Sequence, residues 1–314
     1  AYAIQTEGEM RAALENIAVR APETFREAMQ LTWLYALISG TVNYGRMDVY
    51  LGDFYAADID SGWLTEHEAL ALTQSLWRLI AARQTIFNGR VYIGGLGRPN
   101  EANADRFALV AMEATRTVIE IEPQLTLRFY AGQNPALMDK ALQVIGEGRT
   151  FPMLYNDDVN VPAVENAFQV GRADAEQYLP YGCGEYALDH ISVGSPNCSL
   201  NMLKALEAVL HQGRDMQTGE VIGLATDLRP ATFDDLWSAY ARQIEYSVEQ
   251  LANRHRLEVD TEAAQAAFLY CSMLYDDCIE RGKSLLGGGA RIRGGLIETY
   301  GMVRPGDRWL VCLS

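Results

Sequence analysis

The feature that most constrains the fold is an alternation of short strand patterns and longer helix patterns in the middle of this 314-residue chain. Residues 124–130 alternate between apolar and polar side chains, and residues 153–156 and 177–182 form further short strand patterns. Helical patterns separate these strands, for example over 134–145, where an Asn-Pro pair provides the N-cap and the first helical residue. Strands that alternate with helices predict an α/β fold with a mainly parallel sheet. The pattern alone fits both a closed barrel and an open sheet.

Helical periodicity dominates the rest of the chain. Thr65 and Glu68 form a capping box, which predicts a helix that begins there and extends to about Ala82. A helix over 23–38 is expected to end at Gly40. The same periodicity predicts helices over 8–19, 103–119, 233–253 and 262–280.

A cysteine and a glutamate two residues apart mark the candidate site. In an extended backbone, side chains at positions i and i+2 point to the same side, so Cys183 and Glu185 are expected to face one cavity. Gly182 and Gly184 flank the cysteine and lack a Cβ atom, which lets a substrate approach the sulfur closely. Leucines at helical spacing over 197–210 predict a helix that supports this loop. A free cysteine is most often a small buried hydrophobe, so the pattern needs further support.

Composition and spacing exclude several classes of protein. The formal net charge of −15 argues against a nucleic-acid partner, and no window approaches the apolar length of a membrane span. The five cysteines lack the short spacing of a zinc site, so we expect no metal. The first residues resemble no signal peptide, which indicates a reducing cytoplasm. The glycine-rich segment 89–97 is a poor nucleotide-binding loop, because Pro99 follows it and no helix begins directly after its glycines.

Five segments, in the same order, resemble the glycyl radical enzymes, the pyruvate formate-lyase-like superfamily. The cysteine loop is similar to the Gly-Cys-Val-Glu loop of the eliminating members, with Gly184 in place of the valine. The other matching segments are Gly45–Tyr50, the strand end within 89–97, Pro152–Asp157 and the stretch over 277–291.

The resemblance implies a part of a ten-stranded α/β barrel, with the cysteine loop at its centre and many surrounding helices. We expect residues 1–314 to form a single partial domain that lacks N-terminal barrel segments and the C-terminal glycine radical domain, since no Arg-Val-Xaa-Gly-Tyr type motif is present. Unpaired strand edges in such a part predict a homo-oligomer, or a second chain that completes the barrel. Arg46 and Asp48 are interpreted as structural ion-pair formers and Cys278 as a packed cysteine.

The chemistry implied by the resemblance is a radical elimination on a small polar substrate, by a dehydratase or a C–N or C–S lyase. A glycyl radical, installed by an S-adenosylmethionine-dependent iron–sulfur activating enzyme, would form a thiyl radical at Cys183, and Glu185 would act as the general base. Asn197, His190 and Tyr155 are expected to contact the substrate. Glycerol-type dehydratases have an aspartate where this chain has Asn197, and an amide cannot accept a full proton.

Three alternatives stay open. One is a truncated chain that is inactive or depends on assembly with another polypeptide. Another is acyl transfer of the formate C-acetyltransferase type, which is disfavoured because those loops carry two adjacent cysteines and Gly182 precedes Cys183 here. The third is a non-radical enzyme that uses Cys183 as a nucleophile and His190 as its base.

Overall fold

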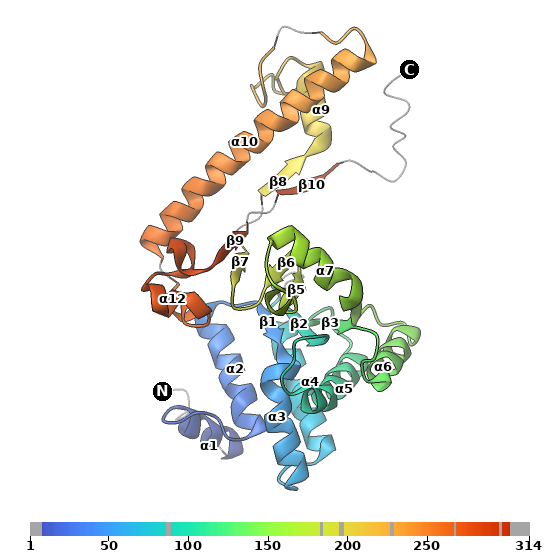
Figure 1. Cartoon of the computed structure of the whole chain (residues 1–314), viewed down its shortest axis with the longest axis vertical. Helices are drawn as coiled ribbons and strands as arrows, with labels where there is room; N and C mark the ends of the chain where they lie inside the picture. The colour runs from blue at the N-terminus through green and yellow to red at the C-terminus, as the bar shows by residue number, and fades with distance from the viewer. Residues whose placement is uncertain are drawn as a thin grey trace. The chain divides into compact units, whose positions relative to one another are not determined.

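The chain divides into two compact units, Ala1–Asp189 and His190–Ser314 (Figure 1). The computed structural model describes residues 8–85, 89–182, 185–194, 198–226, 229–266, 268–294 and 297–301.

A parallel sheet with the strand order β1-β2-β3-β4 forms the centre of the first unit. The register pairs Tyr92 of β2 with Thr126 of β3, and Arg128 of β3 with Tyr155 of β4. The predicted α/β fold with parallel strands is therefore confirmed, and β3 and β4 match the strands predicted over 124–130 and 153–156. Their bounds are β1 (Asn43–Arg46), β2 (Arg90–Gly94), β3 (Gln124–Phe129) and β4 (Met153–Asn156).

One face of this sheet packs on helices, and the other face is polar. Val91 and Ile93 of β2 join Leu125 and Leu127 of β3 in an apolar core with side chains from α2 to α6. Because side chains alternate along a strand, the residues between them point to the opposite face. The helices of this unit up to that point are α1 (Gly8–Ile17), α2 (Phe25–Ser39), α3 (Met47–Asp60), α4 (Glu66–Ala82), α5 (Glu101–Thr117) and α6 (Pro135–Gly146).

Local capping signals set several helix ends as predicted. The Thr65 hydroxyl accepts the Glu68 N–H, and the Glu68 carboxylate accepts the Thr65 N–H, so the capping box at the start of α4 is confirmed. Gly40 adopts a left-handed φ of 73° and ends α2. Asn134 caps α6 through its side-chain oxygen, which accepts the Ala136 N–H.

The strand predicted over 177–182 does not join the parallel sheet. It forms an antiparallel hairpin with the strand that follows it, because Gly182 turns the chain back with a φ of 58°. The prediction of a further parallel strand was therefore wrong. The elements after β4 are α7 (Asp157–Phe168), α8 (Arg172–Ala175), β5 (Tyr178–Tyr181) and β6 (Glu185–Leu188).

The second unit contains two pairs of parallel strands and a long helix. Strand β7 pairs with β9, and β8 pairs with β10. Cys278 is 3% exposed and packs with Val193, Val259 and Leu285, which confirms its interpretation as a packed cysteine. Burial also raises the pKa of its thiol. The elements are β7 (Ser192–Gly194), β8 (Cys198–Asn201), α9 (Met202–Leu210), α10 (Phe233–Gln265), α11 (Leu269–Ser272), α12 (Asp276–Arg281), a π-helical turn (Leu285–Gly289), β9 (Ile292–Gly294) and β10 (Ile297–Tyr300).

Two helix predictions in this unit need correction. The helix expected over 197–210 begins only at Met202, because the preceding residues form β8 and the Asn201 side chain caps α9. The buried residues of α9 are two alanines and a valine. The leucines at helical spacing, which had suggested the packed face of this helix, include the exposed Leu210. The helix expected over 262–280 is interrupted, because Phe268 adopts a left-handed φ of 45°.

Candidate active site

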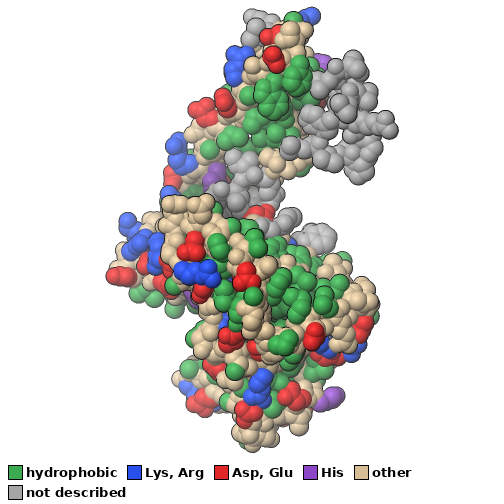
Figure 2. Space-filling model, turned by 45° about the vertical axis from the view of Figure 1, so that its right-hand side comes forward, with side chains coloured by type: hydrophobic (Ala, Val, Ile, Leu, Met, Phe, Trp, Pro, Cys, Tyr) green, Lys and Arg blue, Asp and Glu red, His purple; other side chains and the backbone are tan. Residues whose placement is uncertain are grey.

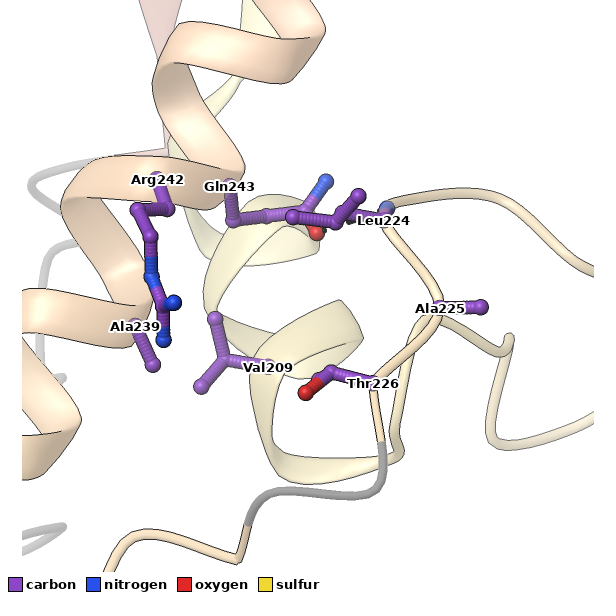
Figure 3. A pocket seen from close by; sticks show the side chains of 7 residues that line it. All are labelled: Val209, Leu224, Ala225, Thr226, Ala239, Arg242 and Gln243. Atoms are coloured by element: carbon purple, nitrogen blue, oxygen red, sulfur yellow. Dashed lines mark hydrogen bonds between the residues drawn. The ribbon is translucent and has the colours of Figure 1, made fainter.

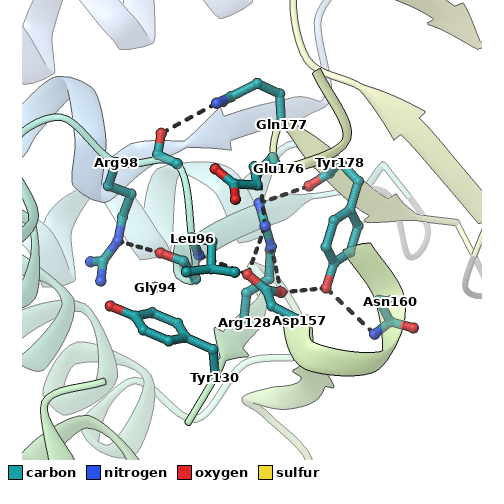
Figure 4. A network of polar contacts seen from close by, with 12 residues as sticks. Gly94, Leu96, Arg98, Arg128, Tyr130, Asp157, Asn160, Glu176, Gln177 and Tyr178 are labelled. Atoms are coloured by element: carbon teal, nitrogen blue, oxygen red, sulfur yellow. Dashed lines mark hydrogen bonds and ion pairs between the residues drawn. The ribbon is translucent and has the colours of Figure 1, made fainter. Parts of the chain in front are cut away.

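A buried polar network joins the carboxyl ends of the parallel strands to the start of β5 (Figure 4). Asp157, the first residue of α7, accepts hydrogen bonds from Arg128 at 2.8 and 3.1 Å, from the Leu96 N–H at 2.7 Å and from the Tyr178 hydroxyl at 2.6 Å. The Arg128 guanidinium also donates to the carbonyls of Tyr178 and Glu176 and lies 4.0 Å from the centroid of the Tyr178 ring. The network therefore holds β5 and its hairpin against the edge of the sheet where β2, β3 and β4 end.

A second set of buried polar groups lies near the carboxyl end of β2. Asp48 forms an ion pair with Arg98 at 3.1 Å and accepts the Gly94 N–H at 2.7 Å, so its structural role is confirmed. Arg46 does not form the predicted ion pair within the described part of the chain. Its terminal nitrogens donate to the carbonyls of Gly94 and Leu96 at the turn after β2, and to the carbonyl of Glu176 shortly before β5.

The hairpin places the predicted base beside the cysteine position. Tyr181 of β5 pairs with Glu185 of β6 across the loop that contains Gly182, Cys183 and Gly184. A Cβ atom on Gly182 would collide with the Glu185 carboxylate, and the positive φ of Gly182 also disfavours any other residue. The carboxylate therefore lies over the backbone directly before Cys183. Cys183 and Gly184 lie outside the described residues, so the placement of the thiol and the role of Gly184 stay predictions.

The polar face of the sheet brings Tyr155 together with residues that the sequence analysis missed. Burial raises the pKa of the Tyr92 hydroxyl well above its usual range. The positive charge of Arg90 lowers this pKa, whereas the acidic groups of Asp189, Tyr155 and Tyr181 raise it further. The Tyr92 hydroxyl thus lies within electrostatic range of Tyr155 and of both ends of the hairpin. The alternation of Arg90 and Tyr92 with apolar residues in β2 was the available signal, and it indicates a strand with one polar face.

Of the other two predicted substrate ligands, one belongs to the second unit and one lies outside the described residues. His190 opens the second unit, where its Nδ1 lies 3.1 Å from the carbonyl oxygen of Leu274. Since a carbonyl only accepts, this contact orients the imidazole with a proton on Nδ1. Asn197 lies outside the described residues. Substrate contact by either residue stays a prediction.

A cavity of about 210 Å³ lies in the second unit beside α9 and α10 (Figure 3). None of the predicted catalytic or substrate-binding residues lines it. The Gln243 amide at its wall accepts the Leu224 N–H at 2.9 Å and donates to Ser247 at 3.3 Å. This amide therefore serves to hold the loop at Leu224 against α10.

Two properties of the described residues concern metal binding and membrane insertion. No group of three or more His, Cys, Asp or Glu side chains among the described residues is arranged to hold a metal ion. None of the described helices is both long and apolar enough to cross a membrane.

A family model described as pyruvate formate lyase-like matches residues 8–307. The chain belongs to the pyruvate formate lyase-like family, a family of glycyl radical enzymes. This confirms the resemblance drawn from the five sequence segments. The family match covers both compact units of the chain.

Members of the family from several organisms are similar to this chain. It is 26% identical to (2S)-3-sulfopropanediol dehydratase of Klebsiella oxytoca, over 93% of this chain and 38% of that protein. It is 27% identical to isethionate sulfite-lyase of Oleidesulfovibrio alaskensis, over 88% of this chain and 37% of that protein. A crystal structure of a glycyl radical enzyme from Archaeoglobus fulgidus matches with a TM-score of 0.79 at 25% identity, over 96% of this chain and 42% of that structure. The chain thus spans about two fifths of the length of these relatives.

Proposed function

We propose that this chain carries the cysteine and the base of a radical eliminase that acts on a small polar substrate. The observation that carries the proposal is the contact between the Glu185 carboxylate and Gly182, directly before Cys183 in the hairpin loop. Family membership and the dehydratase and lyase names of the relatives support the reaction class.

The proposed barrel follows from the two faces of the sheet. Helices cover one face of β1 to β4, and the opposite face bears buried polar side chains such as Tyr92 and Thr126. Parallel strands with an outer layer of helices are the arrangement of an α/β barrel, and the polar side chains of the opposite face would then point into the barrel. In this proposal, residues 1–314 are one part of a ten-stranded barrel, and the hairpin loop lies at its centre.

The proposed mechanism uses both loop residues. A glycyl radical in another segment of polypeptide, installed by an S-adenosylmethionine iron–sulfur activating enzyme, would supply the unpaired electron in exchange for the hydrogen atom of the Cys183 thiol. The Cys183 thiyl then takes a hydrogen atom from the substrate carbon that bears a hydroxyl. Glu185 accepts the hydroxyl proton, the neighbouring group leaves with its bonding pair, and the Cys183 thiol returns the hydrogen atom to the product radical. In this scheme Tyr155, His190 and Asn197 contact the substrate, and the two loop glycines permit its close approach.

Substitution of the two loop residues tests this mechanism in the completed enzyme. Cys183→Ser should abolish turnover and leave the glycyl radical intact, because the serine O–H bond is too strong for hydrogen exchange. Glu185→Gln keeps the shape and loses the proton acceptor, so elimination should slow by about 10²–10⁴-fold. Exchange of deuterium between substrate and the Cys183 thiol should survive in Glu185→Gln, and mass spectrometry of recovered substrate measures it.

The exposed Glu120→Gln is the control and should eliminate at the wild-type rate. Normal turnover by Glu185→Gln would contradict the eliminase assignment and leave Glu185 with a structural role.

A second candidate is a chain that needs another polypeptide before it can act. Two observations favour it: β1 and β4 are the outer strands of the described sheet, and large apolar side chains such as Phe233 and Trp237 are exposed on the second unit. Figure 2 shows hydrophobic side chains on the surface of this unit. If this candidate holds, the chain by itself should not form a monomer with a cooperative melt in size-exclusion and calorimetric runs, because its strand edges and apolar side chains need a covering chain.

A further inference from the structure

Four arginines are deeply buried in the first unit, and three of them are held by partners. Arg128 pairs with Asp157, Arg98 pairs with Asp48, and the terminal nitrogens of Arg46 donate to backbone carbonyls. The fourth, Arg90, is only 5% exposed, and its Nε and Nη1 atoms have no hydrogen-bond partner in the described structure. Buried guanidinium groups without partners are costly, since the group loses its hydration and gains nothing in return.

Arg90 lies on the polar face of the sheet that also bears the candidate site. It is the first residue of β2, two residues before Tyr92 on the same face. Thr126 lies on this face as the β3 partner of Tyr92, and its hydroxyl is fully buried and likewise has no partner within the described chain. Two neighbouring strands therefore present unused hydrogen-bond donors to one buried region.

These unused donors have the chemistry of an anion site. A guanidinium carries a fixed positive charge and several N–H donors that bind the oxygens of a carboxylate or a sulfonate, and a hydroxyl can donate to a further oxygen. The Nε and Nη1 atoms of Arg90 are buried and have no hydrogen-bond partner among the described residues. The positive charge of Arg90 therefore remains available to a bound ligand.

We propose that Arg90, with Thr126, binds an anionic group of the substrate and restricts the substrates of this enzyme to small hydroxylated carboxylates or sulfonates. This inference rests on the proposed function for the identity of the ligand as the substrate. The binding of the anion itself requires neither the radical nor Cys183. A competing occupant is a carboxylate side chain from another segment of polypeptide, which would neutralise Arg90 permanently.

A matched pair of probes tests the charge requirement directly. The probes are 3-hydroxypropanoate and 1,3-propanediol, which differ in one carboxylate, together with isethionate as a sulfonate. Binding is measured by isothermal titration calorimetry on the protein with the Cys183→Ser substitution, at constant ionic strength. The two anions should bind more tightly than the diol. Arg90→Met should weaken anion binding by about 10- to 150-fold and leave diol binding within about twofold, because only the charged hydrogen bonds are lost.

Two further variants keep the test decisive if Arg90→Met fails to fold. Arg90→Lys retains the charge without the paired N–H groups and should bind the anions with intermediate affinity. Thr126→Val keeps the side-chain shape, removes one donor and should weaken anion binding by about 2- to 10-fold. Arg106→Gln, at a surface ion pair with Asp60, is the control and should bind all probes normally.

The outcomes separate this inference from the proposed function. If the wild-type site binds the diol as tightly as the anions, binds no anion, or keeps its anion affinity in Arg90→Lys and Arg90→Met, the inference is wrong. The eliminase proposal is unaffected by that result, since it depends on turnover by Cys183 and Glu185. Conversely, Arg90-dependent anion binding without any turnover would support the site and contradict the eliminase proposal.

Discussion

Asp157→Asn should cause a large loss of stability, because Asp157 is the buried centre of the polar network. The carboxylate is fully buried, and its two oxygens accept two hydrogen bonds each. An asparagine has only one acceptor oxygen, and its NH₂ group takes the place of the other carboxylate oxygen. In either orientation of the amide, this NH₂ group faces an N–H donor of Arg128 or Leu96, so two donors oppose each other. The buried Arg128 charge also loses its counter-ion. Removal of one partner of a buried ion pair costs about 3–5 kcal/mol, and we expect the unfolding free energy of the first unit to fall by that amount.

The assay is urea unfolding followed by tryptophan fluorescence, since Trp77 is fully buried in the core of this unit. Asp158→Asn is a matched control one residue further along α7, where the carboxylate is exposed and accepts the Ala131 N–H. It should cost less than about 1 kcal/mol, because an exposed charge at a helix N-terminus contributes little. If Asp157→Asn and Asp158→Asn differ by less than about 1 kcal/mol, the network does not hold the hairpin in the way described.

Two further predictions concern the hairpin glycine and acid stability. Gly182→Ala should lower the unfolding free energy more than Gly132→Ala does. Both glycines have a positive φ, but only at Gly182 would the added Cβ atom collide with a neighbour, the Glu185 carboxylate. Equal losses in urea unfolding would contradict this contact. Hydrogen bonds from Arg116 and Lys140 lower the pKa of Glu113 to about 2. A lowered pKa stabilises the fold above the unfolded pKa of about 4.3, and this contribution is lost as the pH falls toward 2. The difference in unfolding free energy between wild type and Glu113→Gln should therefore be constant above about pH 5 and shrink below it; a difference that does not change with pH would refute the assigned role.

Elements that depend on nearby residues were predictable from the sequence. The capping box at Thr65, the Asn134 cap and the left-handed Gly40 each act within one turn of their own helix, so their positions followed from local composition. The family was predictable for a different reason, since five short motifs in one order carried it. The candidate site was not predictable in this way: the structure places the Glu185 carboxylate against Gly182, and the shared cavity of Cys183 and Glu185 stays a prediction.

The sequence by itself determined where most helices of the first unit lie and to which family the chain belongs, because capping, periodicity and motif spacing are local properties of the chain. Only the tertiary structure decided that β5 pairs with β6, since the choice of a strand partner depends on which backbone is within reach. It likewise decided that Arg46 donates to carbonyls up to 130 residues away, and that Arg90 is buried without a partner. The desolvation of an arginine and the groups that compensate it arise from segments distant in sequence, and folding alone brings them together.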